Sequence, residues 1–183
     1  MRFSPTALTG VVEVDLEPIE DDRGFFARAW CRDEFTAAGL DATFVQENVG
    51  FSIRAGTLRG LHYQHAPFAE VKLVRCTAGS VWDVAVDLRP ASDTYCQWVG
   101  IELSAERRNM VYVPEGCAHG YLTMTDGAEV RYLTSQPYAP DAAAGVRFDD
   151  EALGIDWPRS VAVVSEQDES WPSLRSAHRE VGT

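Results

Sequence analysis

Residues 71–88 read VKLVRCTAGSVWDVAVDL, and this stretch decides the fold class. Residues 71–76 and 81–88 run apolar or alternate, and both are rich in valine, a β-branched residue that favours strands. The Ala78-Gly79-Ser80 segment between them is typical of a turn. The pattern therefore predicts two strands joined by a tight turn.

The same short-strand pattern recurs along most of the chain, so we expect a mainly β fold. Gly, Pro, Asn and Asp separate the candidates at short intervals, which is typical of a sandwich or barrel. Helix is scarce, with a short helix expected at 32–39 and single helical turns or short helices at 149–153 and 172–179. The further strand candidates are 11–16, 43–48, 57–64, 97–103, 110–113, 119–124 and 128–135.

Length and composition narrow the class of protein. The chain has 183 residues, of which 45% are apolar and 24% charged, and no repeat or linker divides it, so we expect one domain over residues 1–183. No apolar run could span a bilayer, and MRFSPTALTG at the start lacks a signal peptide's apolar stretch, so we expect a cytoplasmic protein. The net charge of −12 argues against nucleic-acid binding.

The cysteines and the single lysine bear on chemistry. The four cysteines are widely spaced without a CxxC pair, which favours free thiols over a zinc cluster. Cys117 lies in a histidine-containing loop, where an ordinary semi-buried thiol is the simpler interpretation. Fifteen of the 16 cationic side chains are arginine, and Lys72 is the only lysine. That exception raises the question of what its amine does.

Residues 57–65, TLRGLHYQH, contain the first histidine. Alternate side chains of a strand point to the same side, so the segment should have two faces. A lone histidine in a strand is more often structural than catalytic, because its near-neutral pKa alone proves nothing. The predicted faces are Arg59, Leu61 and Tyr63 on one side and Leu58, Gly60, His62 and Gln64 on the other.

Residues 114–119, PEGCAH, match part of the second motif of the cupins, small β-barrels that often hold a metal. The first cupin motif needs two histidines separated by one residue, then a glutamate. Here two residues separate His62 from His65, and Glu70 is displaced. Because metal affinity depends on ligand number and geometry, we expect a cupin-like barrel without metal, in which His119 is a polar wall of the cavity.

Nine stretches, in order and with compatible spacing over nearly the whole chain, carry a more specific resemblance. They are DDRGFF (21–26), FVQEN (44–48), TLRGLHYQ (57–64), KLVRC (72–76), GSVWDVAVDLR (79–89), VPEGCAHG (113–120), AEVRYLT (128–134), DDEALGIDWP (149–158) and SEQD (165–168). With them the chain resembles the dTDP-4-dehydrorhamnose 3,5-epimerase family. The resemblance implies a double-stranded β-helix (jelly roll), a homodimer, no cofactor, and inversion of C3, C5 or both in a dTDP-linked 4-keto-6-deoxyhexose.

The resemblance also implies roles for individual residues. His62 matches the catalytic base, and Asp168 the acid that pairs with it. Tyr132 matches the proton donor on the other face of the sugar, with Tyr138 and Tyr63 as its competitors. Lys72 matches the cation near the keto oxygen. Residues that match contacts to the nucleotide, the diphosphate or the sugar are Arg23, Gln46, Asn48, Arg59 and His119, and we add Arg28 and Tyr138 as candidate substrate contacts.

These residue types suit the chemistry. A hydrogen beside a ketone becomes acidic enough to abstract when a fixed positive charge meets the developing enolate oxygen, which Lys72 could supply. Histidine titrates near neutral pH, as a base should, and a carboxylate on its far nitrogen stabilises the imidazolium. Inversion needs a second group on the opposite face, and a tyrosine phenol is a suitable weak acid. Convergent arginines such as Arg59 and Arg23 suit a diphosphate.

The chain departs from the family pattern at three positions. Arg28 stands where the family usually has a glutamate that often contacts the nucleotide, Ala143 lies near a common glutamate, and Gln167 replaces a lysine. All three lie outside the His, Asp, Tyr and Lys set. We therefore expect intact proton transfer, while the nucleotide and sugar specificity stays open. Mono- and di-epimerases share these residues, so inversion of one carbon is an alternative.

Two other classes of function remain open. A metal-dependent cupin enzyme would bind iron, manganese or zinc through His62, His65 and His119. A non-catalytic sugar-nucleotide binder on the same barrel would bind tightly without turnover. Such a binder has no need for an acid, a base and a cation together, which argues against it.

Overall fold

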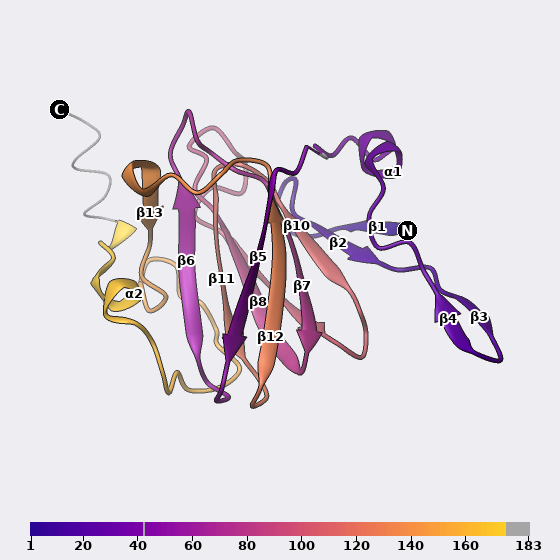
Figure 1. Cartoon of the computed structure of the whole chain (residues 1–183). Coiled ribbons are helices and arrows are strands. Elements are labelled where there is room, and N and C mark those ends of the chain that lie inside the picture. The colour runs from indigo at the N-terminus through magenta and orange to yellow at the C-terminus, as the bar shows by residue number, and fades with distance from the viewer. Residues whose placement is uncertain (42, 175–183) are drawn as a thin grey trace.

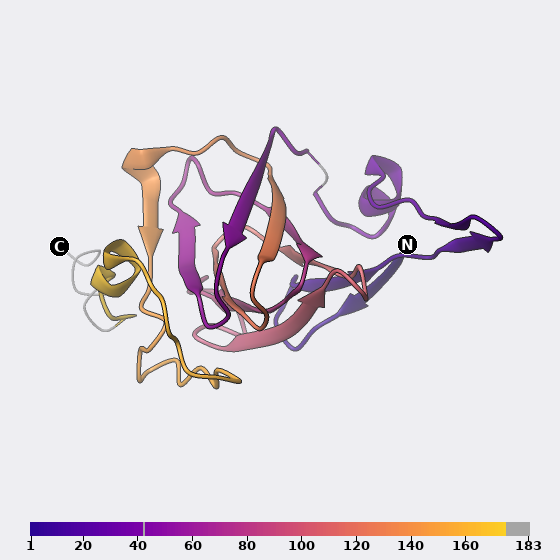
Figure 2. The same cartoon turned by 60° about the horizontal axis from the view of Figure 1, so that its bottom comes forward.

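The body of the protein consists of two antiparallel sheets that face each other (Figures 1 and 2). The computed structural model describes residues 1–41 and 43–174. The first sheet has the order β1 (Arg2–Pro5), β2 (Val12–Asp15), β10 (Met110–Val113), β7 (Lys72–Ala78), β12 (Ala128–Thr134) and β5 (Gln46–Ser52). The second has the order β13 (Ala143–Gly145), β6 (Leu58–Gln64), β11 (Cys117–Thr123), β8 (Ser80–Asp87) and β9 (Trp98–Ser104).

The two strands that decide the fold class form as predicted, but they do not pair with each other. β7 lies in the first sheet between β10 and β12, whereas β8 lies in the second between β11 and β9. The turn at Gly79 therefore carries the chain from one sheet to the other. Its φ of +68° favours glycine, and a Cβ there would lie 2.1 Å from Thr125 Oγ1.

An apolar core fills the space between the sheets away from β5 and β6. Apolar side chains from β7, β8, β9, β10, β11 and β12 meet there, including Val74, Val81, Leu103 and Val130, each at most 1% exposed. Polar side chains replace them on the inward faces of β5 and β6, such as Gln46 and Gln64. The core thus ends where a polar cavity begins.

Smaller elements surround this body. The predicted helix at 32–39 is confirmed as α1 (Arg32–Ala37), anchored by the fully buried Phe35. The segment 149–153 forms turns instead of a helix, and most of the segment 172–179 lies outside the described residues. The prediction missed α2 (Glu166–Ser170), the 3-10 turn at Pro140–Ala142, the short strands β1 and β13, and the hairpin of β3 (Ile19–Asp21) and β4 (Gly24–Phe26).

The expected mainly β architecture with a few short helices is confirmed. All nine predicted strand segments contain strand, with boundaries displaced by a few residues. The β3–β4 hairpin projects away from the two sheets, as Figure 1 shows. Within residues 1–41 and 43–174, no helix is long and apolar enough to cross a membrane.

Candidate active site

Two adjoining cavities open between the sheets. The first has a volume of about 210 Å³ and is lined mainly by β5, β6, β7, β12 and the segment after β12. The second, about 590 Å³, is lined by β5, β6, β11 and the chain leading into α2. The residues that line both are His62, Lys72, Tyr132 and Gln167. The site therefore brings three of the four predicted catalytic residues into the shared wall, and the fourth, Asp168, lines the second cavity.

His62 on β6 pairs with Asp168 of α2. The Nε2 atom of His62 lies 2.6 Å from Oδ1 of Asp168, and the imidazole is about half exposed to the cavity while the carboxylate is buried. A carboxylate on one ring nitrogen selects the tautomer and leaves the other nitrogen free to act on a bound molecule. The predicted pairing of these two side chains thus forms, and their roles as base and acid stay predictions.

Several donors hold the Asp168 carboxylate. The Gly60 backbone N–H donates to Oδ2 at 3.2 Å, and the Trp171 indole N–H donates to Oδ1 at 3.3 Å. Ser165 caps α2 by accepting from the Asp168 N–H, so the start of the helix has a defined position. Burial by itself raises the pKa of Asp168, but the hydrogen bond and charge of His62, with these donors, outweigh it and hold the pKa below its usual value.

A bulge in β6 corrects one expectation about its faces. His62 lies opposite His119 on β11, but Arg59 lies opposite Tyr121, so three steps along β6 face two along β11. One extra residue reverses the alternation, and Arg59 therefore lines the same cavity as His62. The prediction that Arg59 and His62 face opposite ways was wrong. Gly60 lies at this point with φ +133°, where a Cβ would come within 2.5 Å of the Gly120 Cα.

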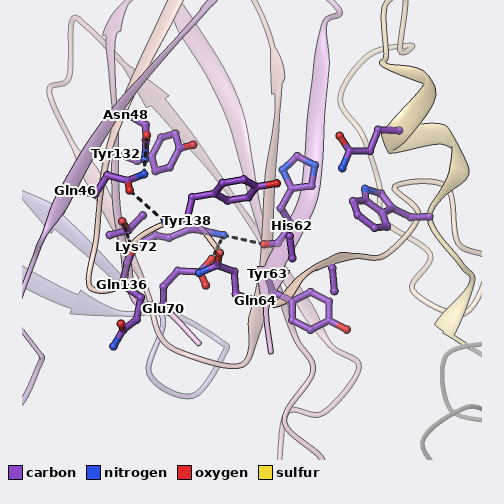
Figure 3. A pocket seen from close by; sticks show the side chains of 15 residues that line it. Gln46, Asn48, His62, Tyr63, Gln64, Glu70, Lys72, Tyr132, Gln136 and Tyr138 are labelled. Atoms are coloured by element: carbon purple, nitrogen blue, oxygen red, sulfur yellow. Dashed lines mark hydrogen bonds and ion pairs between the residues drawn. The ribbon is translucent and has the colours of Figure 1, made fainter. Parts of the chain in front are cut away.

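Lys72 is buried and its amine points between the sheets. The Nζ atom donates to the backbone carbonyl of His62 at 2.9 Å and pairs with Glu70 Oε1, also at 2.9 Å. Figure 3 shows the lysine side chain running from the wall that carries Gln46 and Asn48 toward His62 on the opposite wall. The only lysine of the chain thus places its ammonium beside the backbone of His62, the predicted base.

Tyr132 faces His62 from the other sheet. It lies on β12, whereas His62 lies on β6, and both side chains line both cavities. Burial raises the pKa of the Tyr132 phenol above its ordinary value, the charge of Glu70 raises it further, and Arg59 opposes both. The phenol consequently keeps its proton at neutral pH.

Most of the predicted substrate contacts line the cavities. Gln46 and Asn48 share the inward face of β5 and are hydrogen-bonded to each other at 2.9 Å, and the Tyr138 N–H donates to Gln46 Oε1. These three line the first cavity. His119 lines the second and is held 2.8 Å from the buried Asp83. Seven polar groups from five strands or loops therefore line the two adjoining cavities, counting His62, Tyr132 and Arg59 with the four named here.

Arg23 and Arg28 lie away from both cavities of their own chain. Arg23 is at the tip of the β3–β4 hairpin, with its side chain 89% exposed and paired with Asp21. Arg28 pairs with Glu34 of α1. Within one chain, the structure does not bring these two predicted contacts to the site.

The alternative ligand sets are not assembled in the described part of the chain. His62 and His119 each face a carboxylate, while the ring of His65 packs against Tyr63 outside both cavities. No group of three or more His, Cys, Asp or Glu side chains suited to a metal occurs among residues 1–41 and 43–174. Cys117 is buried, and burial raises its pKa to about 12, so it is a protonated thiol at neutral pH.

The contacts of three further residues were not predicted, although the sequence holds a signal for each. Glu70 precedes Lys72 by two residues, the spacing that puts side chains on one face of an extended chain. Trp171 follows Asp168 by three, the spacing of neighbours on a helix. Asp83 sits in an apolar strand, where a carboxylate needs a partner.

Comparison with known proteins agrees with this geometry. The sequence profile of a family described as dTDP-4-dehydrorhamnose 3,5-epimerase matches residues 5–176. The chain is 42% identical over 177 residues to the dTDP-4-dehydrorhamnose 3,5-epimerase of Methanothermobacter thermautotrophicus, covering 95% of each chain. It is 38% identical to a dTDP-4-dehydrorhamnose 3-epimerase of Streptomyces niveus, covering 92% of this chain and 82% of the relative.

A solved structure shows the same fold. The dTDP-4-dehydrorhamnose 3,5-epimerase of Elizabethkingia anophelis superposes with a TM-score of 0.94 at 37% identity, covering 96% of this chain and 97% of that one. Both the jelly-roll, cupin-like fold and the resemblance inferred from nine sequence stretches are thereby confirmed. The chain belongs to the dTDP-4-dehydrorhamnose 3,5-epimerase family.

Proposed function

We propose that this protein epimerises a dTDP-linked 4-keto-6-deoxyhexose at C3 and C5, without a cofactor, in deoxysugar biosynthesis of the dTDP-rhamnose type. The observation that carries the proposal is the placement of a histidine–carboxylate pair and a phenol on opposite sheets of one cavity, with an ammonium group beside the histidine. The names of the relatives supply the substrate class.

The first step is proton abstraction. His62 removes the hydrogen from the carbon beside the ketone, and the electrons of that C–H bond move to the carbonyl oxygen to form an enolate. The Lys72 ammonium stabilises the negative charge on that oxygen. Asp168 stabilises the imidazolium that His62 becomes, because the carboxylate lies 2.6 Å from the ring nitrogen.

The second step is protonation from the opposite face. Tyr132 gives its phenolic proton to the same carbon as the enolate returns to the ketone, which inverts the configuration. The phenolate then takes a proton from solvent, and His62 loses its proton to solvent. Repeating the sequence at the second carbon beside the ketone inverts the other centre.

The diphosphate and nucleotide require a second copy of this chain. Arg59 lines the second cavity of its own chain, but Arg23 stands on the projecting hairpin. Ile19 and Phe26 on that hairpin are more than 70% exposed, which a monomer would leave in water. We propose that the hairpin inserts against a second copy and delivers Arg23 to its site.

A neighbouring apolar face supports the same dimer. Within the described residues, β5 is an edge strand that pairs only with β12. Val49, Phe51 and Ile53, on and just after β5, alternate outward and are each more than half exposed. An exposed apolar edge strand promotes aggregation unless another chain covers it. In a two-fold dimer the same patch of each subunit packs against the other, so both patches are buried.

Inversion of C3 alone is the second candidate. The Streptomyces niveus relative is a 3-epimerase and shares 38% identity. Two positions that depart from the family pattern, Ala143 and Gln167, line the first cavity, so the departures fall where a bound sugar would meet them.

The four unpaired cysteines fit the reducing cytoplasm that we propose as the site of action.

Incubation with dTDP-4-keto-6-deoxyglucose in heavy water, read by NMR at C3 and C5, tests these candidates. Deuterium at both carbons supports the 3,5-epimerase, and deuterium at C3 alone supports the 3-epimerase. Folded protein that incorporates no deuterium at either carbon would contradict both.

A further inference from the structure

Tyr121 carries a hydroxyl into the second cavity. The residue lies on β11 of the second sheet and lines that cavity. Its side chain reaches across to the first sheet, because a Cβ built on Gly50 of β5 would lie 2.7 Å from the Tyr121 Oη. Gly50 lines the same cavity. The glycine therefore leaves room for the hydroxyl at the cavity wall.

This hydroxyl is unpartnered and can be reached from the cavity. Within residues 1–41 and 43–174, no side chain or backbone group hydrogen-bonds to the Tyr121 Oη. The unpartnered side-chain atoms of that part of the chain that are closed to solvent belong to Glu70, Trp82 and Asp83. The Tyr121 oxygen is not among them. Burial raises the pKa of the Tyr121 phenol and the charge of Arg59 opposes that rise only in part, so the hydroxyl keeps its proton and can donate it.

Arg59 is the one basic side chain lining the second cavity that has no carboxylate partner among the described residues. The other three each pair with an acid, and they are His62, Lys72 and His119. Arg59 instead donates to Ser52 Oγ at 3.2 Å and to the Phe51 carbonyl at 3.0 Å, which are neutral acceptors. The guanidinium is thus held in place with its charge uncompensated, which suits an anionic group of a ligand.

The hydroxyl and the guanidinium converge on one stretch of β5. Tyr121 and Arg59 lie opposite each other on β11 and β6, and their polar ends meet the consecutive residues 50–52 of the facing sheet. We propose that Tyr121 is a substrate-binding residue, whose hydroxyl donates a hydrogen bond to the substrate diphosphate beside Arg59. The inference rests on the proposed function and adds a residue to its diphosphate site.

A phosphate oxygen suits this pair of donors better than a sugar hydroxyl does. The phosphate oxygen is negatively charged, so its hydrogen bond to the phenol is charge-assisted and about twice as strong as a neutral one. The same charge compensates the guanidinium of Arg59, which a sugar hydroxyl would not do. Because the two donors approach from different strands, together they fix the position of the anion.

Calorimetry with dTDP and with dTDP-6-deoxyglucose, which carries no ketone and cannot react, tests the proposal. Tyr121→Phe removes one oxygen and keeps the ring. Its dissociation constants for both ligands should rise about 10- to 100-fold, the range for one hydrogen bond to a charged group. Tyr112→Phe removes the oxygen of another buried tyrosine, outside both cavities, and should bind both ligands as the wild type does.

Two results of this experiment would overturn the proposal. Unchanged affinity of Tyr121→Phe for both ligands would show that the hydroxyl binds no part of the substrate. Weaker binding of dTDP-6-deoxyglucose with unchanged binding of dTDP would assign the hydroxyl to the sugar instead of the diphosphate.

Gly50→Ala tests the position of the hydroxyl independently. The added methyl would lie 2.7 Å from the Tyr121 Oη and displace it, so the affinity for dTDP should fall as in Tyr121→Phe. In the double variant that oxygen is absent, and the alanine should cause no further loss. If the two losses multiply in the double variant, the hydroxyl does not act from its place at Gly50 and the proposal fails.

The outcomes also distinguish this inference from the proposed function. If wild-type protein exchanges deuterium into the 4-keto sugar but Tyr121→Phe binds dTDP as the wild type does, only the role of Tyr121 fails. If the wild type binds neither dTDP ligand and exchanges no deuterium, the proposed function fails and the inference fails with it.

Discussion

The imidazole of His62 and the carboxylate of Asp168 lie 2.6 Å apart, although 106 residues separate them along the chain. The pair couples a strand of the second sheet to a helix near the end of the described chain. It leaves the second imidazole nitrogen free for the proton abstraction that we propose. The position of His62 relative to Asp168 therefore depends on how α2 packs against β6.

Replacing His62 with alanine should abolish deuterium exchange into the sugar. A general base contributes about 10²- to 10⁴-fold to a rate, so exchange measured by NMR in heavy water should fall by at least that lower factor. His65→Ala is the matched control, because that histidine lies outside both cavities and should exchange normally. Exchange at the wild-type rate in His62→Ala would remove His62 as the base.

Tyr132→Phe should separate exchange from inversion. His62 can still remove and return a proton on its own face, so exchange should persist at least in part. Inversion should fall by about 10²-fold or more, because the opposite sheet no longer offers an acid. The ratio of exchanged to inverted product is the measurement. Tyr63→Phe and Tyr138→Phe are the controls, and loss of inversion in either one with full inversion in Tyr132→Phe would reassign the donor.

Trp171→Phe should shift the acidic limb of the pH–rate profile upward. Phenylalanine keeps a ring against His62, now 6.1 Å between centroids, but cannot donate to Asp168. The indole N–H helps to lower the pKa of Asp168, so its loss raises that pKa and the carboxylate is protonated at higher pH as pH falls. At neutral pH the rate should fall only about two- to tenfold, as for one neutral hydrogen bond. An unchanged acidic limb would show that the indole serves only packing.

Asp87→Asn should cost stability in a pH-dependent way. Asp87 is fully buried and accepts from Arg89, Ser92 and Thr94 at 2.5–2.8 Å. Burial raises its pKa, but these donors outweigh burial and hold the pKa well below its usual range. A depressed pKa stabilises the fold above the unfolded-state pKa of about 3.9 and loses that effect as pH falls below it.

Urea unfolding at several pH values measures that effect. At pH 7 the free energy of unfolding of the wild type should exceed that of Asp87→Asn by about 1–3 kcal/mol. This difference should become smaller below about pH 4. Asp93 lies in the same loop but outside this hydrogen-bond network. Asp93→Asn should therefore have the stability of the wild type at each pH. A stability difference that stays constant down to pH 2 would contradict the assignment of the effect to ionised Asp87.

Phe51→Asp should break the proposed dimer. The charged side chain would enter the outward face of β5, and sedimentation should then report a monomer. The rate of deuterium exchange into the sugar should also fall, because Arg23 of a second copy no longer reaches the site. Phe68→Asp changes a similarly exposed phenylalanine outside the sheets and should leave the dimer intact. A dimeric Phe51→Asp protein would place the interface elsewhere.

Local patterns in the sequence determined much of this molecule. Alternation along β5 puts Gln46 and Asn48 on its inward face, and the valine-rich stretches around Gly79 form strands because β-branched side chains suit a pleated, half-buried surface. The nine family stretches predict the His62, Lys72, Tyr132 and Asp168 set.

Only the tertiary structure decided how those strands and side chains combine. The β7 and β8 strands lie in opposite sheets, since a turn reverses the chain without specifying which partner each strand takes. One extra residue in β6, relative to its partner strand β11, places Arg59 in a cavity that His62 also lines. Pairing between residues distant in sequence depends on the packing of the whole core, so local periodicity predicts each strand but not its neighbours.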